Sequence, residues 1–406
     1  MPVYILRSTS QAQLLRTAVM NRRLTAARRA AQVAEVEAKR WEDPGHGEIY
    51  RWLSQADPAK VKRITKSEGN TRITATALVE MPEDEARRMA AEIPSAELIR
   101  DRPLNLIQPN RGAAETKAAL SAPDLWHLEA IGLNAARAKG FTGTGQGVRI
   151  GVLDTGIDPN HPEIAGKIAE AYTFDVPEWR VNPLFPSYDT DGHGTHVAGL
   201  IAGSTVGVAP GVMLVNGIMI PGGHGNLSDF ILALEWSVAS LDVPVQIINM
   251  SAGIPGYLPE MAEAVAGVMS VGVLPVMAIG NEGRNRTRSP GNYNEVVSVG
   301  ASDKRNRVAS FSGGGTLVVD HQQYTVPDLV APGKEVYSCL MTGGYEAWNG
   351  TSMATPIVSG IAALILEKYP EIEVTDLIDA LLDSCVNLGL PVERQGMGLV
   401  QVKSAL

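Results

Sequence analysis

The chain has 406 residues, of which 45% are hydrophobic, and a formal net charge of -9 at pH 7. This length and composition are those of an ordinary globular protein with two or three domains and a large apolar core. The negative charge argues against a general nucleic-acid binder, and the two cysteines, Cys339 and Cys385, indicate no disulfide framework. No apolar run reaches transmembrane length and the N-terminus shows no hydrophobic signal segment, so we expect no membrane partner and a cytoplasmic location.

The N-terminal part alternates between short strands and helices. In chain order we expect a strand at 3–7, a helix over 10–41, a hairpin of 61–64 with 71–79, a helix over 81–93 and a strand at 96–99. Residues 41–60 stay ambiguous because prolines and glycines interrupt them. We interpret the positive charges of the long helix as a solvated or partner-docked face. The order β-α-β-β-α-β predicts a small α+β, ferredoxin-like unit of the split βαβ type.

A small, polar stretch follows this unit. Residues 109–123 are bracketed by Pro109 and Pro123 and contain Asn110 and Gly112, which makes them the best domain boundary in the chain. We therefore divide the chain into a domain of residues 1–110, a linker or processing region of 111–120 and a large domain of 121–406.

From residue 121 onward, strands alternate with helices. We expect strands at 148–153, 213–219, 246–250 and 273–278, and helices at 196–202, 228–240 and 260–269. We expect Ser228 to cap the second of these helices itself. The alternation predicts an α/β fold with three layers, in which a mostly parallel sheet carries helices on both faces.

One serine stands where a long apolar helix is expected to begin. Residues 349–356 read Asn-Gly-Thr-Ser-Met-Ala-Thr-Pro and lead into an uncharged apolar run, 357–366, that predicts a buried helix. Ser352 would lie in the first turn, where unpaired N–H groups and the positive end of the helix dipole favour negative charge. Such a serine can attack a carbonyl, and its own N–H can help to hold the oxyanion. From this stretch alone, a plain helix cap is a fair alternative.

Three more polar residues stand at strand ends or between glycines. Asp154 ends the strand 148–153, at the edge where parallel sheets place their chemistry, although Asp-x-Gly also forms ordinary turns. Glycines on both sides of His193 leave its ring open to a neighbour and to substrate, and the amide of Asn281 can donate to an oxyanion. His193 and His196 could also bind zinc, but no third ligand follows at a metal-like spacing, so we rank zinc below catalysis.

Asp, His, Asn and Ser in this chain order match the subtilisin order of the serine-hydrolase template. Over residues 121–406 the sequence resembles the subtilisin-like serine proteases, the subtilases, and the stretches around His193 and Ser352 fit the family's motifs residue by residue. The resemblance implies that Asp154 is the orienting acid, His193 the general base and Ser352 the nucleophile. It also implies that Asn281 and the backbone N–H of Ser352 form the oxyanion hole.

The same resemblance implies an extended protein or peptide substrate that pairs with two backbone segments. The residues expected to bind it are Gly223, Gly225, Leu227, Ser251, Ala252, Gly253 and Gly280. Leu227 would line a distal apolar pocket. Arg284, Arg286 and Arg288 lie in the segment that closes the primary pocket, where they either favour acidic substrates or form a solvated surface. His196 takes the family's buried structural position.

The N-terminal domain resembles the family's inhibitory propeptide, less specifically than the catalytic motifs match. The resemblance implies a zymogen whose own N-terminal domain acts as an intramolecular inhibitor. The family's junction falls near residues 105–108, but Pro109 follows, and proline after a scissile bond usually blocks hydrolysis. Either the chain is cut later, within 110–120, or the domain stays attached.

Two further stretches depart from the family. Residues 202–210 lack the inserted loop that supplies ligands to the family's strong calcium site, so we expect no metal there and no cofactor. Residues 313–324 are an insertion of unknown purpose.

The sequence therefore predicts a serine endopeptidase that hydrolyses peptide bonds through an acyl-enzyme and is made as a zymogen. The alternative is a binding or scaffold protein whose N-terminal domain keeps the cleft permanently shut. An esterase of the α/β-hydrolase type is disfavoured, because Gly-x-Ser-x-Gly is absent around Ser352.

Overall fold

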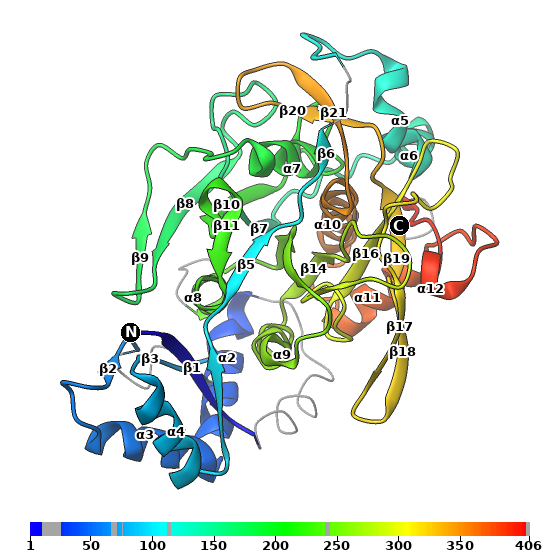
Figure 1. Ribbon diagram of the computed structural model, residues 1–406. Helices are drawn as coiled ribbons and strands as arrows, with labels where there is room; N and C mark the ends of the chain where they lie inside the picture. Colours follow the sequence, from blue (N-terminus) through cyan, green and yellow to red (C-terminus); the bar gives the residue numbers. More distant parts are fainter. Residues whose placement is uncertain (10–25, 66–70, 75, 112–114, 240–243, 403–406) are drawn as a thin grey trace.

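The computed structural model describes residues 1–9, 26–65, 71–74, 76–111, 115–239 and 244–402. A large α/β unit carries a smaller sheet unit, built from the N-terminal part of the chain, at the lower left of Figure 1. Within the described ranges no helix is both long and apolar enough to cross a bilayer.

An eight-stranded sheet forms the centre of the large unit, in the order β19-β16-β14-β12-β7-β10-β8-β9. Its strands are β7 (Arg149–Asp154), β8 (Ile168–Asp175), β9 (Arg180–Pro183), β10 (Met213–Ile218), β12 (Ile247–Met250), β14 (Leu274–Ala278), β16 (Val297–Ser302) and β19 (Leu329–Pro332). Neighbouring strands are parallel except β8 with β9. The predicted α/β fold with a mostly parallel sheet is confirmed, and β7, β10, β12 and β14 are the four predicted strands.

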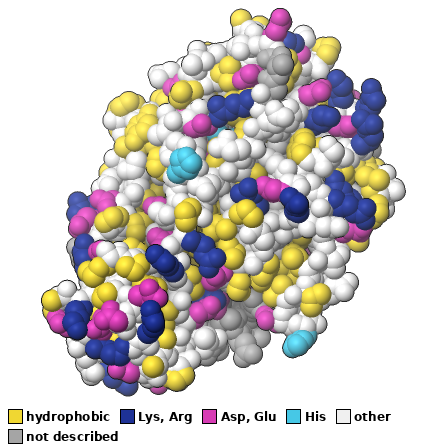
Figure 2. All heavy atoms as spheres, in the orientation of Figure 1, with side chains coloured by type: hydrophobic (Ala, Val, Ile, Leu, Met, Phe, Trp, Pro, Cys, Tyr) yellow, Lys and Arg dark blue, Asp and Glu magenta, His cyan; other side chains and the backbone are white. Residues whose placement is uncertain are grey.

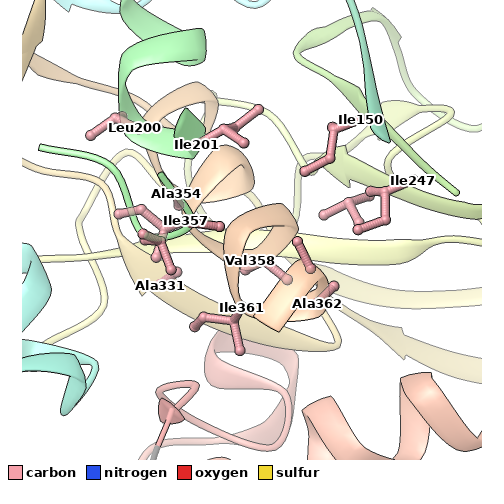
Figure 3. Packing of buried hydrophobic residues seen from close by; sticks show 14 of the residues in the cluster. Ile150, Leu200, Ile201, Ile247, Ala331, Ala354, Ile357, Val358, Ile361 and Ala362 are labelled. Atoms are coloured by element: carbon pink, nitrogen blue, oxygen red, sulfur yellow. The ribbon is translucent and has the colours of Figure 1, made fainter. Parts of the chain in front are cut away.

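Helices cover both faces of this sheet, because successive side chains of a strand point in opposite directions. On β12, Ile247 belongs to one core cluster and Ile248 to the other. The first cluster contains α7 (His193–Ala202) and α10 (Thr351–Lys368), and the second contains α8 (Leu227–Ala239) and α9 (Ala262–Ser270). Figure 3 shows the apolar side chains of α10 packed with those of α7 and the sheet. A helix buried on all sides explains the uncharged run after Ser352.

The remaining elements of the large unit lie around this core. The helices are η2 (Ala122–Leu125), α5 (Trp126–Ala130), α6 (Leu133–Ala138), η3 (Pro221–Gly223), η4 (Pro259–Met261), α11 (Val374–Asp383) and α12 (Val392–Gln395). The strands are β5 (Pro103–Leu106), β6 (Asn110–Arg111), β11 (His224–Asn226), β13 (Ala252–Pro255), β15 (Arg288–Ser289), β17 (Gly315–Val319), β18 (Gln322–Val326), β20 (Val336–Cys339) and β21 (Tyr345–Asn349). The unexplained insertion at 313–324 is therefore mostly the hairpin β17–β18.

The smaller unit is a four-stranded antiparallel sheet in the order β2-β3-β1-β4. Its elements are β1 (Val3–Ser8), α2 (Ala26–Trp41), α3 (Pro44–Gln55), β2 (Lys62–Arg63), β3 (Ala77–Glu80), α4 (Glu83–Glu92) and β4 (Ala96–Arg100). One sheet face packs under α3 and α4, whereas side chains of the other face, such as Ile5 and Leu78, join the core cluster of α8 and α9. Figure 2 shows both signs of charge interspersed over this unit.

Most of the elements predicted for this unit are confirmed. The strands at 3–7 and 96–99 and the helix over 81–93 are β1, β4 and α4, and the ambiguous stretch contains α3. Of the helix predicted over 10–41, α2 is described and residues 10–25 lie outside the described residues.

Two local predictions differ from the structure for the same physical reason. The predicted hairpin forms between β2 and β3, but residues 71–74 are not part of its second strand, because the N–H groups of Ile73 and Thr74 donate to the carboxylate of Glu235 on α8. Ser228 does not cap α8 with its own side chain. Its N–H and hydroxyl instead donate to Asp101, at 3.0 and 2.5 Å. In both places a contact between distant segments overrides the local pattern.

Candidate active site

Asp154 and His193 form a buried pair. Asp154 is the last residue of β7 and His193 the first of α7, and both side chains are fully buried. Nδ1 of His193 lies 2.7 Å from Oδ1 of Asp154, which also accepts the N–H of Thr155 at 2.7 Å. Because a carboxylate can only accept, Nδ1 carries the hydrogen and Nε2 is left as the basic nitrogen of the ring. The carboxylate thereby fixes both the orientation and the tautomer of the imidazole.

Ser352 lies in the first turn of α10, as predicted. Its Oγ donates to the carbonyl oxygen of Ile107 at 3.1 Å, and Nε2 of His193 has no hydrogen-bond partner among the described residues. The structure therefore sets the serine against a peptide carbonyl of the chain's own N-terminal part, without a hydrogen bond to His193.

Asn281 is held on one side and donates on the other. Its Oδ1 accepts the N–H and the hydroxyl of Thr351, at 2.9 and 3.0 Å, so its amide nitrogen points away from α10. Nδ2 donates to the carbonyl oxygen of Gln108 at 3.0 Å. Thr351, which we did not single out from the sequence, therefore positions the amide beside Ser352.

A model of the subtilase family matches residues 145–398. The chain is 36% identical over 287 residues to alkaline elastase YaB of Bacillus sp. (strain YaB), covering 69% of each chain. It is 34% identical to subtilisin DY of Bacillus licheniformis, covering 68% of this chain and 96% of that one. It is also 35% identical over 281 residues to subtilisin E of Bacillus subtilis, covering 67% and 68%. The chain belongs to the subtilase family. It is a serine protease, and proteases of this type act on proteins or peptides.

In this subtilase an extended stretch of its own N-terminal part lies beside the catalytic residues. Strand β5 runs antiparallel between β11 and β13 in the sheet β11-β5-β13-β15, where the cyan ribbon crosses the large unit in Figure 1. Gly225 pairs with Leu104, and Gly253 pairs with Asn105.

The other predicted substrate-binding residues lie along or behind this stretch. Ala252 pairs with Leu106, and the carbonyl of Ser251 accepts the N–H of Ile107 at 3.0 Å. A side chain added at Gly223 would lie 3.5 Å from Cβ of Leu106, so the chain passes close to this glycine.

Leu227 and Gly280 take different places. Leu227 is fully buried in the same cluster as Leu104, and its N–H donates to the carbonyl of Arg102 at 3.0 Å. Gly280 donates its N–H to the hydroxyl of Thr351 at 3.3 Å, so it lies behind Asn281 and does not bond the extended stretch.

The three arginines near the predicted primary pocket are largely paired. Arg288 donates to Glu282 at 2.7 Å and to the carbonyl of Gly253 at 2.9 Å, and Arg284 lies 3.2 Å from Glu393. Because the charges of Arg284 and Arg288 are compensated within the protein, these two residues do not support a preference for acidic substrates.

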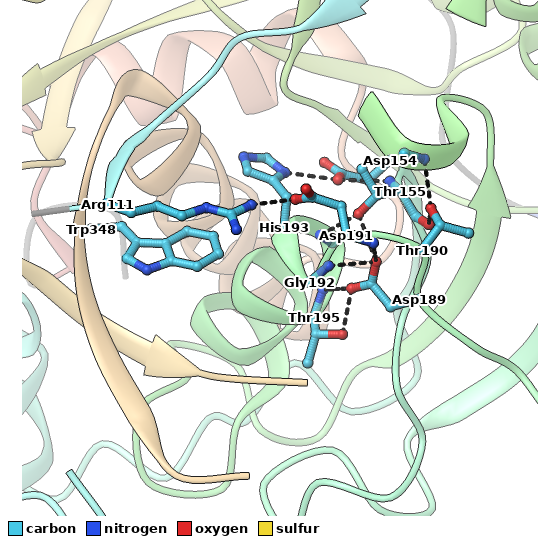
Figure 4. Close-up of polar contacts among 12 residues, drawn as sticks. Arg111, Asp154, Thr155, Asp189, Thr190, Asp191, Gly192, His193, Thr195 and Trp348 are labelled. Carbon is cyan, nitrogen blue, oxygen red and sulfur yellow. Dashed lines mark hydrogen bonds and ion pairs between the residues drawn. The ribbon is translucent and has the colours of Figure 1, made fainter. Parts of the chain in front are cut away.

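Asp189 connects the acid and base segments, and sequence reasoning missed it. One carboxylate oxygen accepts the hydroxyl of Thr155 at 2.8 Å and the N–H of Gly192 at 2.9 Å. The other accepts the N–H and the hydroxyl of Thr195, at 2.8 and 2.6 Å (Figure 4). Asp189 therefore ties the turn after Asp154 to the first turn of α7. An aspartate just before a helix is a capping signal that could have indicated this role.

His196 is a packed, neutral residue. Its ring stacks on Trp348 with centroids 4.2 Å apart, its Nε2 lies 3.1 Å from the carbonyl oxygen of Glu346, and burial lowers its pKa to about 3. Within the described ranges no three His, Cys, Asp or Glu side chains gather as metal ligands.

Proposed function

We propose that this subtilase is a serine endopeptidase that works through an acyl-enzyme at Ser352, is made as a zymogen, and is inhibited by its own N-terminal domain. The observation that carries the proposal is the hydrogen bond from Ser352 to the carbonyl of Ile107. That carbonyl belongs to an extended segment paired on both edges, which is the arrangement of a protease substrate.

The chemistry follows from the positions of the side chains. Nε2 of His193 takes the proton of Ser352 as its Oγ attacks the carbonyl carbon, and Asp154 stabilises the imidazolium that forms. Nδ2 of Asn281 and the N–H of Ser352 stabilise the oxyanion. The imidazolium then gives its proton to the leaving amine, and water hydrolyses the acyl-enzyme in a second round of the same steps.

The segment acts as an inhibitor, because its register does not suit reaction. The carbonyl that faces Ser352 is that of Ile107, but the amide of Asn281 is bound to the next carbonyl, that of Gln108. A carbonyl without its oxyanion donor loses the electrostatic stabilisation on which acyl transfer depends. Pro109, which is buried and follows directly, restricts the backbone from shifting into register.

The N-terminal domain docks through polar contacts that α8 supplies. The buried carboxylate of Glu235 accepts the N–H groups of Ile73 and Thr74, at 3.0 and 2.9 Å, and the hydroxyl of Thr74 at 3.1 Å. Asp101 caps the same helix at Ser228. The ferredoxin-like assignment of the domain rests on its β-α-α-β-β-α-β order and on the strand order β2-β3-β1-β4.

A second docking site lies at α9. Arg7 is buried between Glu97 of its own sheet and Glu263 of α9, which lie 2.5 and 3.5 Å away. Its Nη1 also donates to the carbonyl of Glu260 at 3.2 Å. Removing one partner of such a buried pair leaves a charge without compensation, so these contacts define one docked position.

We further propose that the loop after α7 needs no calcium. The family's strong calcium site would require free oxygen ligands there. The carboxylate of Glu163 is instead used by the N–H of Thr205, at 2.6 Å, and by the hydroxyl of Tyr345, at 2.9 Å. The carbonyl of Ala202 accepts from the ammonium of Lys167 at 2.5 Å, so a side chain supplies the positive charge. These residues do not fit a calcium ion.

Two further predictions concern the cellular location and the alternative function as a scaffold. The cytoplasmic location stays a prediction, and one matching relative is named an extracellular serine proteinase. The relatives that the chain matches are named as proteases or elastases, so the comparisons give the scaffold alternative no support.

The test combines activity labelling with mass spectrometry on the full chain. A fluorophosphonate should label the parent chain slowly, should label Glu235→Arg faster, because that change undocks the N-terminal domain, and should not label Ser352→Ala. If Glu235→Arg folds, yet is neither labelled nor able to cleave casein, the peptidase proposal is wrong. Intact mass of the parent against Ser352→Ala shows whether the chain cuts itself within residues 108–121.

A further inference from the structure

We infer that Asp191 and Trp348 form a subsite for an arginine side chain on the leaving-group side of the scissile bond. The inference rests on the proposed peptidase function and names a substrate class for it, peptides with arginine at the fourth position after the bond that is cut. Arg111 of the chain itself occupies the subsite in this structure.

The backbone around Arg111 is fixed by strand pairing. Strand β6 pairs antiparallel with β21, which puts Arg111 opposite Trp348 and Asn110 opposite Asn349. The amide of Asn349 also donates to the carbonyl of Asn110 at 3.1 Å. Strand β21 leads directly into the first turn of α10. The pairing of β6 with β21 therefore places Arg111 at a fixed position relative to Ser352. Arg111 is the fourth residue after Ile107, whose carbonyl Ser352 contacts.

Two kinds of contact recognise the guanidinium. Nη2 of Arg111 forms an ion pair with Oδ1 of Asp191, and the guanidinium carbon lies 4.4 Å from the ring centroid of Trp348 (Figure 4). The planar guanidinium stacks on aromatic faces better than an ammonium does, so the subsite favours arginine over lysine.

The subsite is rigid and does not depend on Arg111 for its shape. Trp348 is buried, its ring stacks with those of His196 and His193 at centroid distances of 4.2 and 6.2 Å, and its Nε1 donates to Glu346 at 2.8 Å. The N–H of Asp191 donates to Asp189, which holds its backbone next to α7. The ring of Trp348 and the backbone of Asp191 are therefore held by contacts other than those to Arg111, and a substrate arginine that follows the same strand path meets both residues.

The first experiment measures whether the subsite holds Arg111 in the full chain. Trypsin is added to the inactive Ser352→Ala chain, and cleavage after residue 111 is timed by mass spectrometry. Adding Asp191→Asn should raise this rate by about three- to thirtyfold, because a partly exposed ion pair contributes little but measurably. Asp379→Asn on the exposed face of α11 is the matched control, and cleavage after the exposed Arg87 is the internal control. Equal rates in Asp191→Asn and Asp379→Asn would overturn the inference.

The second experiment measures selection of substrates. Two fluorescence-quenched peptides are compared, and both repeat residues 104–111 with alanine in place of Pro109. The arginine peptide keeps Arg111, and the glutamine peptide has glutamine at that position. The full-length chain with Glu235→Arg, which undocks the N-terminal domain, and Arg111→Ala, which vacates the subsite, should cleave the arginine peptide with a kcat/KM about three- to thirtyfold higher. Adding Asp191→Asn should remove most of this preference. A ratio near one in this chain would exclude the substrate role while leaving the protease intact.

The two proposals fail in different ways. If the Glu235→Arg, Arg111→Ala chain folds, yet cleaves neither peptide and a fluorophosphonate leaves Ser352 unlabelled, the peptidase proposal fails. The trypsin measurement, made on a chain without the serine, then still decides whether Asp191 binds a guanidinium.

Discussion

On the two sides of Ile107 the same extended segment is held by different forces. On the acyl side, β5 is paired along both edges, and Leu104, Leu106 and Ile107 are 0%, 2% and 1% exposed. On the leaving-group side, β6 is paired along one edge, and Asn110 and Arg111 are exposed. Apolar burial scales with area and is not screened by salt, whereas a partly exposed ion pair is weak and screened. We therefore expect the segment to open from the leaving-group side first.

The largest effect is expected from changes to the catalytic side chains, which lie at the boundary between the acyl side and the leaving-group side of the segment. Ser352→Ala and His193→Ala should each abolish peptide cleavage, because acid, base and nucleophile work as a unit. In subtilisin itself such changes lower turnover about a millionfold, and we take the expected size from that measured case. Ser54→Ala, on the exposed part of α3, is the control. Turnover in Ser352→Ala at the level of the control would end the assignment.

The acyl side of the segment should dock more weakly when its apolar contacts are removed. Leu104→Ala leaves a cavity and should weaken docking of the segment by about 2–5 kcal/mol. Labelling of Ser352 by a fluorophosphonate should then speed up by more than about tenfold, since each 1.4 kcal/mol is a factor of ten. Val318→Ala, a side chain that is 69% exposed on β17, should change nothing. A labelling rate like that of the control would show that burial of Leu104 does not hold the segment.

The acyl side should also respond to pH. Asp229 and Asn105 line the same cavity, and burial, the largest cause, raises the pKa of Asp229 from 3.8 to about 6. A raised pKa means that the docked state favours the protonated form. This stabilisation is fully present below the ordinary pKa and is lost as the pH rises through about 6.

Labelling of Ser352 at pH 8 should therefore exceed that at pH 5 severalfold, beyond the change in the reactivity of His193 itself. Asp229→Asn should remove that excess. At each pH the labelling rate of the parent chain is divided by that of Asp229→Asn, so that the pH dependence of His193, which both chains share, cancels. A ratio that does not change with pH would show that groups other than Asp229 cause the pH dependence of labelling.

The smallest effect is expected for metal removal, because we propose that the loop after α7 holds no calcium ion. With Glu163 and Lys167 bonding the loop after α7, excess chelator should shift the melting temperature by less than a few degrees. A fall of more than about ten degrees, which corresponds to several kcal/mol for a chain of this size, would show a calcium site elsewhere.

The sequence predicted what depends on local motifs. The strand end at Asp154, the helix with Ser352 in its first turn, and the alternation of strands and helices are local patterns, and the structure has them where they were expected. The helix expected over 196–202 begins three residues earlier, at His193. The roles of these side chains stay proposals, although Asp154 and His193 do lie in contact.

Contacts between distant segments could not be predicted in the same way. Alternation over residues 71–79 predicts a strand, but Glu235, more than 150 positions away, takes the N–H groups of Ile73 and Thr74. Asp101 replaces Ser228 as the cap of α8, and Arg111 meets Asp191 only because the chain folds back. No periodicity encodes such pairs, since each depends on how two finished units meet.

The continuity of the chain through the segment 103–111 has a consequence for how inhibition behaves in solution. A ligand tethered at both ends competes with substrate at an effective concentration set by the geometry of its attachments, in the millimolar range for short tethers. Dilution removes a separate inhibitor but leaves a tethered one in place, so the fraction of open molecules should be the same at nanomolar and micromolar enzyme. A substrate will therefore displace the segment only when its concentration divided by its dissociation constant exceeds the effective concentration of the segment divided by the dissociation constant of the segment. Cutting the chain once on the C-terminal side of Ile107 would convert the inhibition into one that dilution relieves.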